Sequence, residues 1–139
     1  MIVYVETSAL LRWLFSESDA ETIAHSINSA TGVVTSVLTM MESERIIIRS
    51  HCRGMLAASG FQAAGRTLKN FSSDWELMEV SPLVRSRVGQ PFPLEPIRTL
   101  DAIHLASALD FSRVYPDFAM LTRDRKILDN AVRLGIPTC

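Results

Sequence analysis

The chain alternates short apolar runs, typical of strands, with longer stretches in which apolar residues recur at helical spacing. Residues 2–5 form the first run, and residues 8–15 then show apolar side chains on one helical face. The further strand candidates are residues 32–35, 76–80 and 118–121, with residues 136–138 as a candidate edge strand. Strands that alternate with helices form a mainly parallel sheet. We therefore expect one α/β domain over residues 1–139, with a central sheet of four or five strands flanked by helices on both faces.

Capping residues locate the predicted helix starts. Ser18 and Glu21 have the spacing of a capping box, which predicts a helix that continues to about residue 29. Ser36 is expected to cap a long helix that ends near residue 51. Ser81, followed by Pro82, predicts the start of a shorter helix.

Glycine and proline locate the predicted breaks. Residues 53–73 are expected to form one or two helices, broken near Gly54 and Gly60. Residues 90–96 contain three prolines and must be irregular. Gly135 is expected to end the last helix.

The predicted helix over residues 98–109 is apolar or small around nearly its whole circumference, yet it carries Asp101 in its first turn. Such a helix is typical of one buried between layers. Two explanations remain open for Asp101: a helix cap, where an anion is worth about 0.3 to 1 kcal/mol, and a metal ligand at the mouth of a cleft. His104, one turn later, fits a hydrogen-bonded core histidine better than a proton donor.

Three other acids follow predicted strands. Glu6 and Asp124 stand at strand-to-helix junctions, and Glu42 lies about two turns into the helix after a strand. The carboxyl ends of parallel strands are where ligands gather in such sheets. Each acid also has a simpler explanation, because Glu6 and Asp124 can cap their helices and Glu42 can pair with Arg45 on the surface.

Convergence of these carboxylates with Asp101 would need a cation. Carboxylates about 6 Å apart repel by roughly 3 kcal/mol per pair at an effective dielectric constant near 20. Hard oxygen ligands without nearby cysteine or paired histidine select Mg²⁺ or Mn²⁺. We therefore expect a divalent metal site if the four acids meet.

Composition narrows the class of protein. Apolar residues make up 47% and charged residues 21% of the chain, which is typical of a globular domain. Cys52 and Cys139 are too few for a disulfide framework or a cysteine zinc site. The start lacks the basic segment of a signal peptide, and no apolar run is long enough to cross a bilayer. We expect a cytoplasmic protein.

Positive charge is concentrated in the middle of the chain. The net charge is −1, but residues 45–69 contain no acid. Their cations are Arg45, Arg49, Arg53, Arg66 and Lys69. A solvated basic face, or the complement of an acidic partner, explains this segment most simply, and phosphate binding is the alternative. Arg45, Arg49 and Arg53 are the candidate RNA- or partner-binding residues.

Four segments in order resemble the PIN-domain family, and within it the small VapC-like toxins of type II toxin–antitoxin systems. Residues 2–11 (IVYVETSALL) resemble the opening strand and first acid, and residues 35–42 (TSVLTMME) resemble the second-acid segment. Residues 98–109 (RTLDAIHLASAL) resemble the third-acid helix. Residues 121–124 (LTRD), followed by LGI at 134–136, resemble the fourth-acid segment and the family's ending.

The resemblance implies a single PIN domain over residues 1–139 and a metal-dependent ribonuclease that cleaves RNA. The implied catalytic and metal-binding acids are Glu6, Glu42, Asp101 and Asp124, with Mg²⁺ or Mn²⁺ as the cofactor. Thr7, Ser8 and Thr122 would orient ligands or waters. The implied partners are an RNA substrate, a cognate antitoxin and a second copy of the chain, with no membrane.

One residue departs from the family pattern. The first acid is ordinarily Asp, whereas this chain has Glu6, whose carboxylate reaches about 1.5 Å further. If the longer side chain misplaces a ligand, Mn²⁺ should support faster cleavage than Mg²⁺. The alternative function is a catalytically weak or silent PIN fold that binds RNA or a protein. A phosphatase is disfavoured because no Asp-x-Asp follows the first strand and no glycine-rich phosphate loop occurs.

Overall fold

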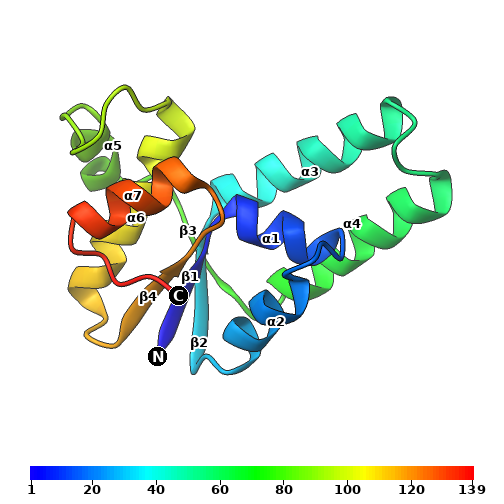
Figure 1. Cartoon of the computed structure of the whole chain (residues 1–139), viewed down its shortest axis with the longest axis horizontal. Helices are drawn as coiled ribbons and strands as arrows, with labels where there is room; N and C mark the ends of the chain where they lie inside the picture. The colour runs from blue at the N-terminus through cyan, green and yellow to red at the C-terminus, as the bar shows by residue number, and fades with distance from the viewer.

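A parallel sheet of four strands runs through the middle of the molecule in the order β3-β2-β1-β4 (Figure 1). The computed structural model describes residues 1–139. The strands are β1 (Ile2–Val5), β2 (Gly32–Ser36), β3 (Glu76–Met78) and β4 (Phe118–Leu121), and every pair is parallel. This confirms the predicted fold class. The expected edge strand at residues 136–138 is reduced to one bridge between Met120 and Thr138.

Helices cover both faces of the sheet, because neighbouring side chains of a strand point to opposite sides. Tyr4 packs into a core beneath α5 (Pro82–Val88), α6 (Thr99–Val114) and α7 (Arg125–Arg133). Val3 and Val5 pack into a second core. The helices on that side are α1 (Thr7–Leu14), α2 (Ala20–Asn28), α3 (Val37–Cys52) and α4 (Ala58–Ser72). Figure 1 shows these two helical layers on either side of the strands.

Helices α3 and α4 form an arm that projects from the second layer (Figure 1). The turn between them contains Gly54 at φ +73°, as the sequence predicts. The predicted break at Gly60 is wrong, because α4 runs through it without interruption. Apolar residues on the inner face of α4 hold the helix in place, and the ring of Phe71 stacks on Trp13 of α1 at 3.7 Å.

The predicted capping box at the start of α2 is also wrong. Asp19, not Ser18, is the N-cap residue, and its side chain makes no capping hydrogen bond. The Asp19 carboxylate instead accepts hydrogen bonds from Arg12 at 3.2 Å and from Arg123 at 2.9 Å. Ion pairs with Arg12 and Arg123 take the place of a local cap. By contrast, Ser36 and Ser81 cap their helices as expected.

Chain segments that bear functional candidates meet at one edge of the sheet. Glu6 follows β1, α3 follows β2 directly, and Thr122 follows β4. Because all strands run the same way, these junctions lie together at the carboxyl edge. None of the helices is both long and apolar enough to span a membrane.

Candidate active site at the carboxyl edge of the sheet

Glu6 is a buried helix cap whose side chain ties β1 to β4. It is 4% exposed and accepts a hydrogen bond at Oε2 from the backbone N–H of Ser8 at 3.0 Å. The hydroxyl of Thr122 donates to the same oxygen at 2.8 Å, and so does the hydroxyl of Ser8. The capping explanation is therefore confirmed. The hydroxyl groups of Ser8 and Thr122 also fix the direction of the Glu6 carboxylate.

Glu42 is held from two other helices. Its Oε1 accepts a hydrogen bond from the Thr7 hydroxyl at 2.8 Å and lies 2.7 Å from Nε2 of His104. Partial burial favours a raised pKa for Glu42, but the hydrogen bonds from His104 and Thr7 and the charge of Arg98 outweigh it, so the pKa is lowered. The alternative pairing with Arg45 is wrong, because Arg45 is exposed and forms no ion pair.

His104 links the acids on different elements. Its side chain is 1% exposed, and its Nδ1 lies 2.9 Å from the Tyr4 hydroxyl. The interpretation as a hydrogen-bonded core histidine is confirmed. Nε2 also lies 4.0 Å from Oε1 of Glu6, so Glu6 and Glu42 face the same edge of this imidazole.

Asp101 is 8% exposed and stands in the first turn of α6. The capping explanation for it is wrong, since the N-cap residue is Arg98, which makes no capping hydrogen bond. The Asp101 carboxylate instead accepts a hydrogen bond from Nε of Arg98 at 3.1 Å. Asp124, in contrast, does cap α7, with Oδ1 accepting from the backbone N–H groups of Lys126 at 2.8 Å and Ile127 at 3.0 Å.

Arg98 is a cation that interacts electrostatically with Asp101, Asp124 and Glu42. Its pKa is raised, first by the hydrogen bond and charge of Asp101 and then by the charges of Asp124 and Glu42. Sequence reasoning missed this residue. A signal existed, because a positive charge at a helix N-cap opposes the helix dipole and therefore calls for nearby anions. The exposed guanidinium marks the mouth of the acid site.

Each acid keeps one oxygen free of protein donors. The held oxygens are Oε2 of Glu6, Oε1 of Glu42, Oδ2 of Asp101 and Oδ1 of Asp124. The four remaining oxygens accept no hydrogen bond from the protein, and none of them is fully buried. Each is therefore accessible to solvent. As the side chains stand, no three His, Cys, Asp or Glu residues form a cage for a metal ion. Mg²⁺ sites in proteins often use only one or two carboxylates and several waters, so such a site does not require a cage of protein ligands.

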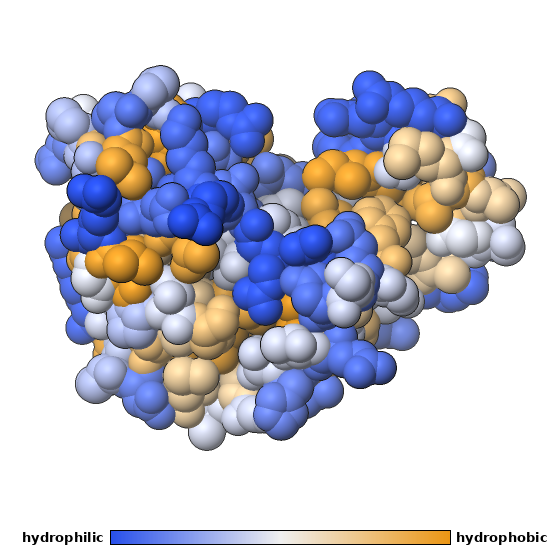
Figure 2. All heavy atoms as spheres, in the orientation of Figure 1, coloured by the Kyte–Doolittle hydropathy of each residue, from blue (hydrophilic) through white to orange (hydrophobic).

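The surface near this edge is hollowed. Figure 2 shows a notch between the α3–α4 arm and the part of the molecule formed by α5, α6 and α7, with mainly hydrophilic atoms on the α5–α7 side and both hydrophilic and hydrophobic atoms on the side of the arm. Arg45, Arg49 and Arg53 are exposed on α3 and at its end. The arm also carries a groove of about 650 Å³ with a mainly apolar lining, and Glu44, Arg66 and Lys69 are among the residues that line it.

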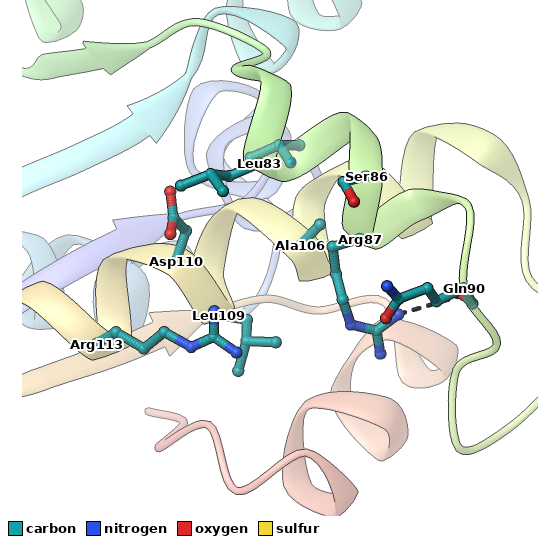
Figure 3. Close-up of a pocket in the computed structure, with 9 residues that line it drawn as sticks. Leu83, Ser86, Arg87, Gln90, Ala106, Leu109, Asp110 and Arg113 are labelled. Carbon is teal, nitrogen blue, oxygen red and sulfur yellow. Dashed lines mark hydrogen bonds between the residues drawn. The ribbon is translucent and has the colours of Figure 1, made fainter.

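A separate cavity of about 230 Å³ lies between α5 and α6, away from the four acids (Figure 3). It is lined by Leu83, Arg87 and Arg113, among others, and by Asp110. Arg87 is fixed there by the ring of Phe92, 4.0 Å away. None of the predicted site residues lines this cavity.

Fold and site together define an α/β protein with acids at the carboxyl edge of a parallel sheet. Comparison with known proteins identifies its family. Residues 3–133 match the PIN domain, and the chain belongs to this family. It is 30% identical to Ribonuclease VapC35 of Mycobacterium tuberculosis over 137 residues, which cover 97% of this chain and 93% of that protein.

Solved structures share the fold at low sequence identity. The VapBC2 complex of Rickettsia felis, bound to a DNA fragment from its promoter, has a TM-score of 0.67 at 13% identity and covers 100% of this chain and 98% of that one. VapC20 of M. tuberculosis, described as a Sarcin-Ricin loop cleaving toxin, has a TM-score of 0.65 at 14% identity, with 91% and 93% covered.

Proposed function

We propose that this chain is a metal-dependent endoribonuclease that hydrolyses RNA phosphodiester bonds and acts as the toxin of a toxin–antitoxin pair. The observation that carries the proposal is the set of four acids, each with one oxygen fixed by the protein and one facing solvent. Its PIN-domain relatives VapC35 and VapC47 are named ribonucleases. The cytoplasm, where RNA is abundant, is the proposed location.

The acids divide into two roles in this proposal. Glu6 and Asp101 would hold Mg²⁺ or Mn²⁺, and Glu42 and Asp124 would hold its waters or a second ion. When bound, the ion lowers the pKa of a water and offsets the charge that develops on the phosphate. The chain's own contribution is orientation, because each of the four carboxylates already accepts at least one hydrogen bond from the protein.

Hydroxyl groups supply much of this orientation. Thr122 and Ser8 hold Glu6, and Thr7 holds Glu42. Oxygen ligands that are themselves hydrogen-bonded keep their direction when the ion or substrate changes. These three side chains are therefore assigned to positioning of the acids and not to contact with RNA.

Basic residues offer a path for the RNA backbone. Arg45 lies one turn beyond Glu42 on α3, and Arg49 and Arg53 continue along the arm. All three are exposed, and none forms an ion pair within the chain. Guanidinium groups without carboxylate partners are free to bind phosphate. We assign them to RNA, with the scissile phosphate at the acids.

A cognate antitoxin and a second copy of the chain are the proposed protein partners. VapBC complexes are among the structures that share the fold. The groove of the α3–α4 arm has a mainly apolar lining and suits an amphipathic segment of an antitoxin. Leu83 on α5 and Leu100 on α6 are large apolar side chains left exposed, at 70% and 43%, and suit contact with a second copy.

The test is cleavage of total cellular RNA by the purified protein with Mg²⁺, with Mn²⁺ and with EDTA. We expect cleavage with either ion and none in EDTA. A parallel preparation of Asp101→Asn separates this activity from a contaminating nuclease. Equal cleavage in EDTA would contradict the metal-dependent mechanism. Tight RNA or antitoxin binding without cleavage under any condition would favour the silent PIN fold.

A further inference from the structure

Tyr4, His104 and Glu42 form a line of hydrogen bonds that leads from the core to the acid site. Tyr4 is fully buried on β1, and its hydroxyl lies 2.9 Å from Nδ1 of His104. Nε2, on the opposite side of the same ring, lies 2.7 Å from Oε1 of Glu42. The three residues come from β1, α6 and α3, so the line joins elements that are far apart in the sequence.

The surroundings of the ring decide which nitrogen carries the proton. Nε2 faces oxygen atoms only: Glu42 Oε1 at 2.7 Å, the Thr7 hydroxyl at 3.1 Å and Glu6 Oε1 at 4.0 Å. Because the Thr7 hydroxyl donates its own proton to Glu42, it has none left for Nε2. Nε2 must therefore be the donor toward Glu42.

Tyr4 fits this arrangement from the other side of the ring. Tyr4 is completely buried, and a phenol is protonated at neutral pH, so its hydroxyl group has a proton to donate. A phenol that keeps its proton donates it to Nδ1, which must then accept. Tyr4 and the oxygens around Nε2 select the same tautomer of His104 independently.

We propose that His104 and Tyr4 are positioning residues for Glu42: Tyr4 fixes the His104 tautomer with the proton on Nε2, and that N–H holds Oε1 of Glu42 so that Oε2 points into the site. This inference rests on the proposed function of Glu42 in metal-dependent cleavage. The hydrogen bond between a ring nitrogen and a carboxylate is the kind of outer contact that sets the direction of a functional acid.

The same ring also sets the spacing between two acids. His104 stands one turn after Asp101 on α6, and its Nε2 contacts Glu42 on α3. Helices α3 and α6 lie on opposite faces of the sheet (Figure 1), so few contacts join them directly. The bond from His104 to Glu42 is therefore a link that keeps Asp101 and Glu42 in register across the sheet edge.

The decisive variant is Tyr4→Phe, which removes one hydroxyl and leaves the ring in the core. Tyr115→Phe is the matched control, since the Tyr115 hydroxyl donates to Glu76 on the surface at 3.1 Å, and the chain has no other tyrosine. His104→Leu removes both ring contacts, whereas His104→Gln keeps an amide N–H near the position of Nε2. Circular dichroism establishes that each variant is folded at the assay temperature.

Three measurements test the proposal. Nitrogen-15 spectra of the imidazole rings, simplified because the chain has only three histidines, should show the Nε2–H form for His104 in the wild type and a mixture in Tyr4→Phe. Single-turnover RNA cleavage should fall about tenfold in Tyr4→Phe and about 100-fold in His104→Leu. His104→Gln should recover part of that loss, and Tyr115→Phe should match the wild type. Calorimetric Mg²⁺ affinity should weaken in the same order.

A wild-type spectrum with the proton on Nδ1 would overturn the assignment. Folded Tyr4→Phe and His104→Leu proteins that cleave RNA and bind Mg²⁺ like the wild type would overturn the positioning role. Equal losses in His104→Gln and His104→Leu would show that packing, not the N–H donor, is what matters. If the wild type binds Mg²⁺ but cleaves no RNA, the proposed function fails by itself, and the spectra and Mg²⁺ affinities still decide the positioning role.

Discussion

Asp101→Asn separates folding from function at the candidate site. The Asp101 carboxylate does not cap α6, so its replacement removes no capping hydrogen bond. The asparagine oxygen can still accept the hydrogen bond that Arg98 donates at 3.1 Å. The ion pair with Arg98 is also lost, but it contributes little because the Arg98 side chain is exposed. The main remaining effect is the loss of a negative charge in the first turn of a helix, worth about 0.3 to 1 kcal/mol. For a chain of this size, we expect the melting temperature to fall by no more than about 4 °C.

The expected loss of activity is larger. A charged group that stabilises the reacting phosphate or its ion is worth about 10²-fold or more in rate when removed, which corresponds to about 2.7 kcal/mol in activation free energy. That figure exceeds the predicted change in stability several-fold. Rate and stability should therefore separate clearly in this variant.

The assay is single-turnover cleavage of total cellular RNA at saturating Mg²⁺, beside thermal unfolding followed by circular dichroism. Asp110→Asn is the matched control, because Asp110 lies on the same helix but lines the cavity between α5 and α6. It should keep wild-type activity. A folded Asp101→Asn protein with full activity would refute the reasoning and leave Asp101 only its electrostatic effect on the helix. An equal loss in Asp110→Asn would show that the assay reports something other than the acid site.

Three other outcomes are expected. Glu6→Asp should lower cleavage with both Mg²⁺ and Mn²⁺, because the carboxylate retreats by about 1.5 Å from its donors on Ser8 and Thr122; faster Mg²⁺ cleavage would instead support a misplaced ligand. The pKa of Glu42 is lowered in the folded protein. The ionised Glu42 carboxylate therefore stabilises the fold fully above its ordinary pKa of 4.5, and this stabilisation is lost as the pH falls through the lowered pKa. Urea unfolding of wild type and Glu42→Gln should thus differ at neutral pH and converge in acid, and a constant difference would contradict this. We expect a basic side chain of the antitoxin to enter the acid cluster and compete with Mg²⁺, so the two should weaken each other's binding equally in calorimetric titrations. Independent binding would place that side chain away from the acids.

Local patterns in the sequence determined most of the fold. The boundaries of β1 and β4 are those that the apolar runs predict. Ser36, Ser81 and Gly135 mark helix ends as expected. These features depend on backbone conformation and on hydrogen bonds between near neighbours, so a short window of sequence contains the information.

The same patterns located the acids but not their partners. Glu6 and Asp124 follow strands of a parallel sheet, and the carboxyl ends of such strands meet at one edge. That argument needs only strand order along the chain. It applies to these two acids, whereas Glu42 and Asp101 lie within helices. The roles of all four acids were predicted from the resemblance to the PIN-domain family, and the family membership is confirmed.

Only the tertiary structure decided which residues hold each acid, and at which positions a local capping or helix-breaking preference is overridden. Thr122 reaches Glu6 across 116 positions, and His104 reaches Glu42 across 62. The Asp19 carboxylate makes no capping hydrogen bond and instead binds Arg123, which lies 104 positions away. α4 continues through Gly60 because its apolar face is buried. Contacts between distant residues form only after the chain has folded, and their combined free energy exceeds the few tenths of a kcal/mol, up to about 1, by which local propensities differ.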